Sequence, residues 1–221
     1  MKTILKAINL SKAVTAPEGE LTILDAVNLS IPSGSSVAIT GSSGSGKSTL
    51  LGLLAGLDTP SNGKVIMDGS DLSRLDEDGR AQCRAGRVGF VFQSFQLVHS
   101  LSALENIMLP MELADLANAR ERSKEILQQV GLSERGSHYP AQLSGGEQQR
   151  VAIARAYALQ PKILFADEPT GNLDKKTGDT IINLLFDMNQ NSQTTLVLVT
   201  HDTRLASKCD ITYQLEAGRL I

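Results

Sequence analysis

The chain has 221 residues, of which 41% are hydrophobic and 20% are charged, and its formal net charge is −3. This length allows a substantial buried core, and the slightly acidic balance gives no reason to expect nucleic acid as a partner. No apolar run approaches the ~20 residues that span a bilayer, and the first residues are typical of a strand rather than a cleavable signal. Cys83 and Cys209 lack metal-ligand spacing and are expected to be reduced thiols of a cytosolic protein. We therefore expect a soluble protein that works at a membrane only if another protein holds it there.

Short apolar runs between turn residues predict the early strands, and a charged stretch over 74–86 predicts a helix. These strands are expected over 3–10, 21–31, 65–67 and 88–92. From about 94 to 160 strand-like runs vanish, and helical periodicity is centred on 112–131 and 145–159. The chain then alternates through a strand over 162–167, a helix over about 175–191, a strand over 195–200, a short helix and a hairpin around Ala217-Gly218. This order predicts an α/β core over 1–93 and 161–221, with an N-terminal antiparallel β region and a helical subdomain over about 94–160.

The sequence element with the clearest chemistry is a loop rich in glycine and serine, which follows the apolar run at 37–40 and precedes a helical run. It fits the G-x-x-x-x-G-K-[ST] pattern of a phosphate-binding loop, which requires a strand before it and a helix after it. Small residues let backbone N–H groups surround a phosphate, the helix start adds partial positive charge, and Lys47 adds a full charge. The alternative is a turn with an unrelated lysine. We favour a nucleotide site, with the Ser48 hydroxyl available to Mg²⁺, formed by Gly41, Ser42, Ser43, Gly44, Ser45, Gly46, Lys47, Ser48 and Thr49.

Polar residues follow four short apolar runs, at the point where each run ends. The residues that follow these runs are the first glycine of the phosphate loop, Gln93, the Asp167-Glu168 pair and His201. In open α/β sheets, ligands bind outside the carboxyl ends of the parallel strands. Four such ends therefore predict one shared site.

Asp167 and Glu168 lie side by side where a buried strand is expected to stop. Because successive strand side chains point to opposite faces, the two need not have the same role. Asp167 suits Mg²⁺, directly or through water, and Glu168 suits a general base that orients and deprotonates an attacking water. The setting of His201 favours contact with a γ-phosphate, whereas His99 and His138 are expected at the surface. The alternatives are a solvated acidic loop and a neutral structural histidine.

A second phosphate site is predicted in the stretch Leu-Ser-Gly-Gly-Glu-Gln-Gln-Arg at 143–150. Ser144 and Glu147 form an S-x-x-E capping box that opens a helix to about residue 159. A capping box alone does not explain two glycines in the first turn, each of which costs about 1 kcal/mol of helix propensity. Gly145 and Gly146 let an anion approach the helix N-terminus closely.

Taken together, these motifs resemble the ATP-binding subunit of an ABC transporter. The resemblance rests on the phosphate loop, the Gln93 loop, LSGGEQQR, the Ile-Leu-Phe-Ala-Asp-Glu strand, Gly171-Asn172-Leu173-Asp174 and His201. The order and spacing of these motifs cover nearly the whole chain. Within the family, the stretches at 92–97, 103–107 and 167–174 are similar to the lipoprotein-releasing (LolD), macrolide-exporting (MacB) and YbbA-type ATPases, and most similar to the YbbA type.

The resemblance implies a Mg²⁺-dependent ATPase that works as a head-to-tail homodimer. Each ATP would lie between the phosphate loop of one subunit and the LSGGEQQR stretch of the other. It implies catalytic roles for Glu168, His201 and Gln93, Mg²⁺ binding by Ser48, Gln93 and Asp167, and nucleotide binding by Ser144, Gly145, Gly146 and Asp174. It also implies a separate transmembrane permease that holds the chain on the cytoplasmic face of the inner membrane. Phe90 and Phe92 are expected to pack in the core, and Phe95 either packs there or lines the groove for this permease.

The sequence departs from the family pattern at the expected adenine site. Family members usually stack adenine on an aromatic residue near the end of the first strand. Residues 1–40 contain no Phe, Tyr or Trp, and Val14 takes this place. We therefore expect weaker selectivity for the base, while the phosphate chemistry is unaffected.

Two other functions fit parts of the sequence. The first is a soluble ABC ATPase that acts on nucleic acid or ribosomes and is not coupled to a membrane protein. The acidic balance, the single nucleotide domain and the lack of long coiled-coil insertions disfavour it. The second is an adaptor that binds ATP without turning it over, and the presence of Glu168 and His201 argues against it.

Overall fold

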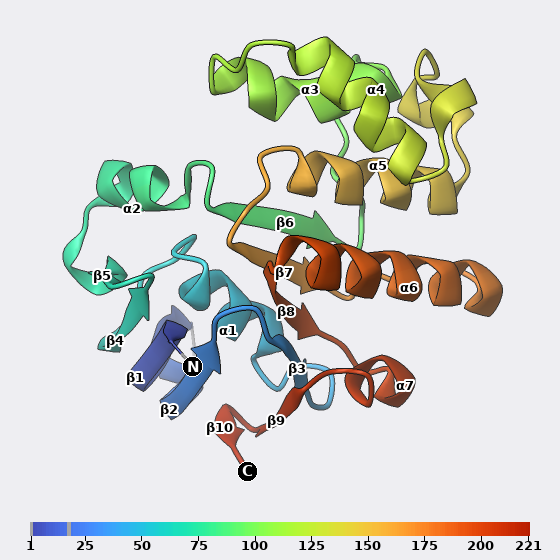
Figure 1. The fold of residues 1–221 in the computed structure, drawn as a ribbon. Coiled ribbons are helices and arrows are strands. Elements are labelled where there is room, and N and C mark those ends of the chain that lie inside the picture. The colour runs from blue at the N-terminus through green and yellow to red at the C-terminus, as the bar shows by residue number, and fades with distance from the viewer. Residues whose placement is uncertain (1, 17–18) are drawn as a thin grey trace. The chain divides into compact units, whose positions relative to one another are not determined.

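The computed structural model describes residues 2–16 and 19–221 and has the α/β architecture that the sequence predicts (Figure 1). The chain divides into two compact units, one made of Met1–Ala85 with Thr195–Ile221 and the other of 86–194. Within the described ranges, no helix is both long enough and apolar enough to cross a membrane.

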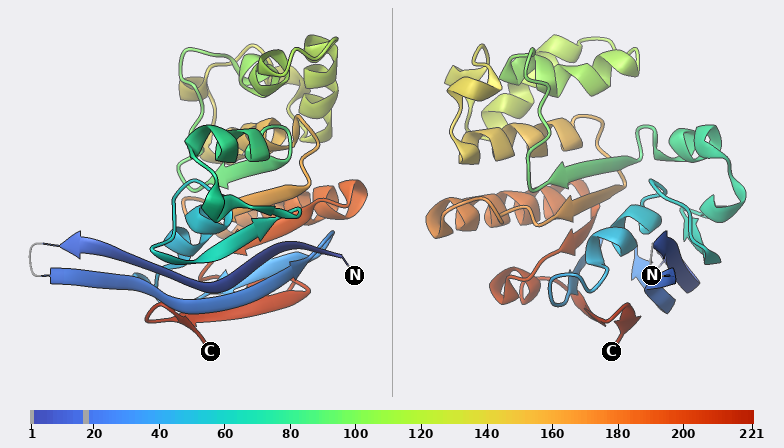
Figure 2. Two further views of the ribbon diagram at one scale, coloured as in Figure 1. Left: turned by 90° about the vertical axis from the view of Figure 1, so that its left-hand side faces the viewer. Right: turned by 180° about the vertical axis from the view of Figure 1, so that it is seen from behind.

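The first unit begins with an antiparallel sheet in the order β2-β1-β4-β5. Its strands are β1 (Thr3–Ala16), β2 (Gly19–Pro32), β4 (Asn62–Met67) and β5 (Ser70–Asp71). Buried and exposed residues alternate along the second half of β2, as expected for a sheet with one face on a core. The predicted early strands are confirmed, and β1 and β2 pair beyond them as a long ribbon (Figure 2). Near the end of this β1–β2 ribbon, Val14 lies opposite Leu21, and both side chains are exposed.

Parallel strands form the other sheet of this unit. β3 (Ser36–Thr40) lies between β8 (Thr195–Val199) and β9 (Ile211–Glu216) and runs parallel to both. β8 is buried throughout, as expected for a parallel strand covered on both faces. β9 pairs with β10 (Arg219–Leu220) through Ala217 and Gly218, which both have positive φ as a type I′ turn requires. The predicted closing hairpin is therefore confirmed.

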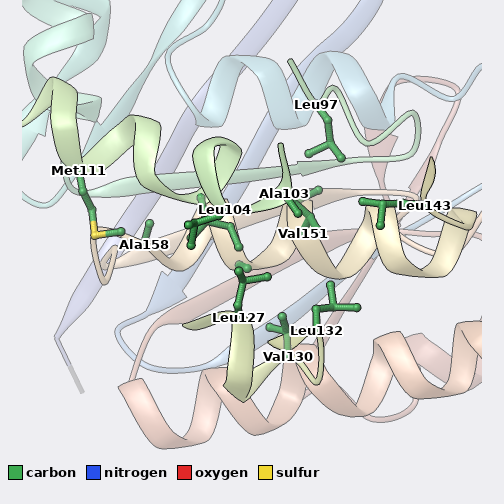
Figure 3. Close-up of a cluster of buried hydrophobic side chains, with 13 residues drawn as sticks. Leu97, Ala103, Leu104, Met111, Leu127, Val130, Leu132, Leu143, Val151 and Ala158 are labelled. Carbon is green, nitrogen blue, oxygen red and sulfur yellow. The ribbon is translucent and has the colours of Figure 1, made fainter. Parts of the chain in front are cut away.

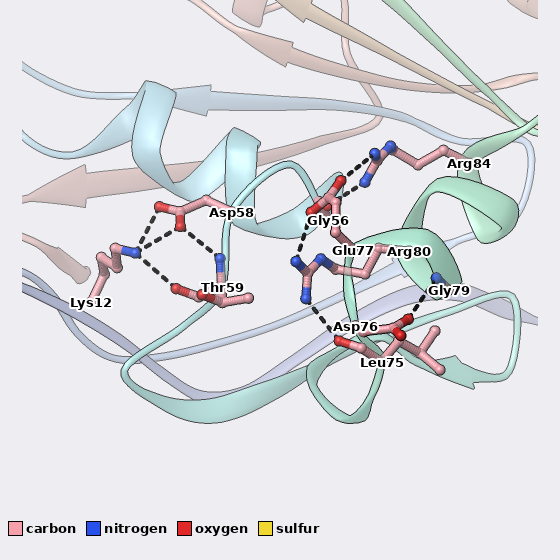
Figure 4. Close-up of polar contacts among 10 residues, drawn as sticks. All are labelled: Lys12, Gly56, Asp58, Thr59, Leu75, Asp76, Glu77, Gly79, Arg80 and Arg84. Carbon is pink, nitrogen blue, oxygen red and sulfur yellow. Dashed lines mark hydrogen bonds and ion pairs between the residues drawn. The ribbon is translucent and has the colours of Figure 1, made fainter.

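The helices of the first unit are α1 (Lys47–Leu54), α2 (Glu77–Arg84) and α7 (Thr203–Ala206), with a 3-10 turn at Leu72–Arg74. Polar contacts hold α2, which buries none of its residues (Figure 4). Glu77 accepts hydrogen bonds from Arg80 at 2.7 Å and from Arg84 at 2.9 Å, and Arg84 also donates to the carbonyl oxygen of Gly56. α2 begins later than the helix predicted over 74–86, because the Asp76 side chain caps it by accepting from the Gly79 N–H at 2.8 Å.

In the second unit, β6 (Val88–Phe92) pairs in parallel with β7 (Ile163–Asp167). Its helices are α3 (Ala103–Leu113), α4 (Ala119–Gln129), α5 (Gly145–Tyr157) and α6 (Lys175–Ser192), with 3-10 turns at Ser133–Arg135 and Pro140–Gln142. The strands expected over 88–92 and 162–167 are confirmed, as are the helices over 145–159 and 175–191, with small differences at their ends.

The helical structure expected around 112–131 is confirmed in α4, but it is not continuous over this range. The chain instead forms α3 and α4, and the two are separated where Asp115 and Asn118 adopt φ values of 51° and 61°. α3 starts at a capping box between Ser102 and Glu105, well before the stretch in which the apolar spacing is clearest.

A cluster of buried aliphatic side chains joins α3, α4 and α5 (Figure 3). Met111, Leu127 and Val151 are among its members, and Phe95 packs against it. Of the two roles expected for Phe95, the structure therefore favours packing. The Phe90 ring stacks on Phe92 at a centroid distance of 5.6 Å and on the buried Phe165 at 5.5 Å. Phe90 and Phe92 are themselves half-buried, so they lie at the margin of the core rather than inside it as expected.

Candidate functional site

The phosphate loop lies between β3 and α1, where the sequence predicts it. α1 has Gly46 as its N-cap, at φ 97°, and no side chain caps the helix. No side chain therefore competes with a ligand for the first N–H groups of α1. Gly41 has φ 153°, and a Cβ on it would lie 2.1 Å from the carbonyl oxygen of Leu215. This position accepts only glycine.

Lys47 is buried in this loop, with 8% of its surface exposed. Its Nζ donates to the carbonyl oxygens of Gly41 at 3.0 Å and Ser42 at 2.8 Å. In the same loop, the buried Oγ of Ser45 has no hydrogen-bond partner among the described residues. Phosphate oxygens would satisfy both the ammonium and the hydroxyl, so these two groups fit an anion held in the loop.

His201 follows the strand next to β3. Ile39 of β3 lies opposite Val199 of β8, and the Thr200 N–H donates to the carbonyl oxygen of Ile39 at 3.2 Å. Because the two strands are parallel, the chain leaves both at the same edge, and the exposed His201 follows there. The surface position expected for His99 is confirmed, whereas His138 is half-buried.

The two acidic residues at the end of β7 have different backbone conformations. Asp167 ends the strand, and Glu168 adopts a left-handed φ of 46°. The chain turns here, because the Gly171 N–H donates to the carbonyl oxygen of Glu168 at 3.0 Å. Positive φ is uncommon for a residue with a Cβ, and such residues cluster at functional sites. This geometry supports different roles for the two half-buried carboxylates.

Gln93 follows β6 beside the end of β7, because Phe92 lies opposite Asp167 in the parallel pair. Its Nε2 donates to Oδ1 of Asn172 at 3.0 Å, and Nδ2 of Asn172 donates to the carbonyl oxygen of Gln93 at 3.0 Å. The sequence places Asn172 in a motif, but nothing in it indicates that Asn172 pairs with Gln93. The two residues are 79 positions apart, and no local pattern indicates that they meet.

The N-terminus of α5 forms the second predicted phosphate site. The Ser144 Oγ accepts from the Glu147 N–H at 3.3 Å, and the Glu147 carboxylate accepts from the Ser144 N–H at 2.8 Å. The predicted capping box is therefore confirmed. A hollow of about 290 Å³ opens beside it, lined by Ser144, Gly145, Gly146, Glu147, Arg150, Asn172, Leu173, Asp174 and Thr177. The hollow brings Asp174 together with the Ser-Gly-Gly turn, two features that the sequence places in separate motifs.

The structure adds a packing reason for one of the two glycines. A Cβ on Gly146 would lie 2.4 Å from Cγ2 of Thr177 on α6, so the approach of α6 to α5 requires glycine there. A Cβ on Gly145 would make only ordinary contacts, the nearest with Leu173 at 3.4 Å. Asp174 caps α6 by accepting from the Thr177 N–H at 3.1 Å, and hydrogen bonding with Thr177 holds the pKa of Asp174 below its usual value.

Glu147 makes the stability of the fold sensitive to acid. Hydrogen bonds from the Ser144 backbone, from Arg135 and from the Ser144 hydroxyl lower the pKa of Glu147 from 4.5 to about 2. Because the folded pKa lies below the unfolded one, this stabilisation is present above about pH 4.5 and is lost as the pH falls toward about 2. Between about pH 5 and about pH 3 we expect the wild type to lose on the order of 1 to 2 kcal/mol more unfolding free energy than Glu147→Gln. Urea unfolding at both pH values measures this difference, and equal losses would contradict it.

Oxygen ligands suited to Mg²⁺ are available on both units. They are the Ser48 hydroxyl, the Gln93 carboxamide and the Asp167 carboxylate. In the part of the chain that the structure describes, no group of three or more His, Cys, Asp or Glu side chains is arranged to hold a metal. Mg²⁺ commonly keeps several waters and binds one or two carboxylates together with substrate phosphates. Donors of this kind therefore fit a cation that arrives with a nucleotide.

The predicted site residues fall into three groups, each within one unit. The first unit holds Gly41, Ser42, Ser43, Gly44, Ser45, Gly46, Lys47, Ser48, Thr49 and His201. The second unit holds one group at the ends of β6 and β7, made of Gln93, Asp167 and Glu168. It holds another around the hollow at α5, made of Ser144, Gly145, Gly146 and Asp174.

Comparison with known proteins gives consistent matches along the chain. The family described as ABC transporter matches residues 24–171. The chain is 52% identical to the uncharacterized ABC transporter ATP-binding protein YbbA of Escherichia coli K12, over 99% of this chain and 97% of that protein. It is 45% identical to the lipoprotein-releasing system ATP-binding protein LolD of Hahella chejuensis, over 98% of this chain and 95% of that protein. Among solved structures, the dimeric post-hydrolysis state of the ATP-binding cassette MJ0796 with ADP and Pi matches with a TM-score of 0.91 and 41% identity, covering 98% of this chain and 96% of that one.

Proposed function

The chain belongs to the ABC transporter family as an ATP-binding subunit, and from this premise we propose that it hydrolyses ATP with Mg²⁺ to drive a separate membrane subunit. The observation that carries the proposal is the buried Lys47, held by carbonyl oxygens in a glycine loop at the start of a helix. A buried ammonium next to free helix N–H groups is a setting for the phosphates of a nucleotide.

The residue groups have distinct parts in the proposed hydrolysis. Lys47 and the loop N–H groups bind the outer phosphates and stabilise the charge that develops there. Glu168 orients and deprotonates the attacking water, and His201 contacts the γ-phosphate. When bound, Mg²⁺ supplies positive charge at the phosphate oxygens. The residues proposed to hold it are Ser48, Gln93 and Asp167.

We propose a head-to-tail homodimer in which each ATP lies between the phosphate loop of one protomer and the Ser144 turn of its partner. Two features of one chain support this arrangement, namely the Lys47 loop and the hollow lined by Ser144, Gly145 and Asp174. The related cassette MJ0796 was solved as a dimer with ADP and Pi. In this scheme, residues 1–93 and 161–221 form the core of each protomer and about 94–160 form the helical subdomain.

The membrane subunit in this proposal is a transmembrane permease of the lipoprotein-release or macrolide-export type. It would hold the ATPase dimer on the cytoplasmic face of the inner membrane, because a chain without a spanning helix in its described part needs such a partner to act there. The relatives named YbbA and LolD are both described as ATP-binding proteins, which supports a subunit that works with a separate permease. No nucleic-acid partner is expected at a net charge of −3.

Two measurements test the proposed function together. The purified chain should release phosphate from ATP in steady state only when Mg²⁺ is present, and Lys47→Ala should abolish this release. A tagged chain should copurify with a membrane protein from detergent-solubilised membranes. Absence of phosphate release would favour the alternative of an adaptor that binds ATP without hydrolysing it. ATPase activity without any membrane partner would favour a soluble ABC ATPase.

The chain is also expected to discriminate weakly between ATP and GTP. Val14 and Leu21 are cross-strand neighbours with 36% and 57% of their surfaces exposed. They offer a base an apolar surface without an aromatic ring, which removes ~1 kcal/mol of stacking. Because phosphates and Mg²⁺ then dominate binding, the two affinities should lie within about tenfold.

Competition binding of the two nucleotides measures this ratio. Val14→Tyr restores a ring at the position and should tighten binding of both purines severalfold. A wild-type preference of about a thousandfold for ATP would contradict the expectation and point to an adenine pocket elsewhere.

A further inference from the structure

The side chains of Gln93 and Asn172 form a closed pair of hydrogen bonds. Asn172 Nδ2 donates to the main-chain carbonyl oxygen of Gln93 at 3.0 Å, and Gln93 Nε2 donates to Asn172 Oδ1 at 3.0 Å. Both residues belong to the second unit, so the pair forms within one compact body. It connects the loop that follows β6 to the segment that follows Glu168.

This pair fixes which way the Gln93 carboxamide faces. A main-chain carbonyl oxygen can only accept, so the Asn172 atom that faces it must be the amide nitrogen. The other Asn172 atom is then the oxygen, which requires a donor from Gln93, and Nε2 is the only side-chain donor that Gln93 has. The Gln93 Oε1 is thereby directed away from Asn172. Oε1 is also the only atom of this side chain that can bind Mg²⁺, because the cation prefers oxygen ligands.

Two neighbours further restrict the conformation of the Gln93 side chain and of the loop that follows it. A Cβ on Gly171 would lie 2.7 Å from Gln93 Nε2, so only glycine leaves room for the carboxamide in this position. Further along the loop, Arg155 of α5 donates to the carbonyl oxygens of Phe95 at 3.2 Å and Gln96 at 2.6 Å. Phe95 and Gln96 both have left-handed φ values, of 60° and 47°. Such conformations are unfavourable for residues with a Cβ, so the loop needs contacts of this kind to keep its shape.

We infer that Asn172 is a positioning residue for Gln93, which orients Gln93 Oε1 toward the Mg²⁺ of the proposed function. The same side chain also lines the hollow at the N-terminus of α5. Asn172 lines this hollow together with Ser144, Gly145 and Asp174. One side chain thus contacts the hollow proposed for the partner's ATP and holds the residue proposed to bind Mg²⁺ at the chain's own ATP. The inference rests on the proposed function for the identity of the metal, but the hydrogen-bonded pair itself requires no nucleotide.

The first test uses the nucleotide-free protein and therefore needs no activity. Asn172→Ala removes both hydrogen bonds, and Gly171→Ala displaces the Gln93 carboxamide by direct contact. Both variants should raise the amide hydrogen exchange of residues 94–97 by about tenfold, because the loop loses the contacts that order it. Gly178→Ala is the matched control, since its Cβ would meet Thr170 at an ordinary 3.6 Å. Wild-type exchange in Asn172→Ala and Gly171→Ala would overturn the inference, as would equal increases in all three variants.

The second test follows the metal. In Asn172→Ala, the concentration of Mn²⁺ that gives half-maximal binding to the protein–ATP complex, followed by electron paramagnetic resonance, should rise about fivefold to tenfold. The Mg²⁺ concentration for half-maximal hydrolysis should rise in parallel, with a smaller change in kcat at saturating metal. Asn172→Asp keeps an acceptor for Gln93 Nε2 and should recover part of the metal affinity.

A loss of kcat without any change in metal requirement would show a merely structural role and would overturn the inference. If the wild type binds ATP but does not hydrolyse it, the proposed function fails while the exchange and Mn²⁺ measurements still decide the inference. The two failures are therefore distinguishable.

Discussion

Glu168→Gln is expected to bind ATP normally and to lose roughly a hundredfold or more in turnover. The glutamine side chain keeps the size of the carboxylate but cannot accept a proton from the attacking water. Binding should survive, because the groups that we propose hold the phosphates, Lys47 among them, lie in the other unit of the chain. The left-handed φ of 46° at residue 168 is a backbone feature, and glutamine is no worse suited to it than glutamate.

The consequence should be visible without kinetics. If ATP closes the dimer and hydrolysis opens it, Glu168→Gln dimers should accumulate with ATP bound and elute early in size exclusion. Glu134→Gln, which replaces an exposed carboxylate, is the matched control and should behave as wild type. Near-normal turnover of Glu168→Gln would remove Glu168 from the role of general base.

The parts of the fold that sequence predicts well are those encoded by local pattern. The continuous apolar runs of β3 and β8 identify buried parallel strands, and the S-x-x-E signature at Ser144 and Glu147 gives the start of α5 to the residue. The glycine loop before Lys47 is also local, because strand, turn and helix start follow one another directly. These are the features whose energetics depend on neighbours in sequence.

The parts that sequence misses depend on contacts between distant residues. The helical spacing of apolar residues in the sequence continues past the end of α3. The break before α4 falls at Asn118, which has a left-handed backbone conformation, and no glycine or proline there reveals it in the sequence. The need for glycine at Gly146 comes from Thr177 on another helix, so the sequence suggests only the anion-binding reason. The Gln93–Asn172 pair likewise depends on the parallel pairing of β6 with β7, which brings the two loops together.

The composite site offers the prediction with the sharpest outcome, because it depends on arrangement rather than on one residue. Lys47 and Ser144 each belong to a proposed phosphate site, and we propose that they serve one ATP only across the dimer. A two-fold dimer repeats every contact reciprocally. Lys47→Ala therefore damages both sites of a homodimer, and so does Ser144→Arg, which places a bulky side chain at the hollow.

Mixing the two inactive variants should restore activity. After subunit exchange, about half of the dimers contain one protomer of each kind. In these dimers one site carries both substitutions, and the other joins an intact Lys47 to an intact Ser144. ATP-dependent crosslinking at the intact interface should return, together with hydrolysis at up to about a quarter of the wild-type rate if one site works alone.

The control is a mixture of Lys47→Ala with a second phosphate-loop variant, Gly41→Ala, which should stay inactive because every site lacks a working loop. Gly41→Ala is suited to this, since its Cβ would collide with the Leu215 carbonyl oxygen and distort the loop itself. If Lys47 and Ser144 instead act on the same nucleotide within one chain, no mixture contains an undamaged site. Subunit exchange verified by fluorescence, with neither crosslinking nor hydrolysis recovered in the Lys47→Ala and Ser144→Arg mixture, would refute the composite site for this protein.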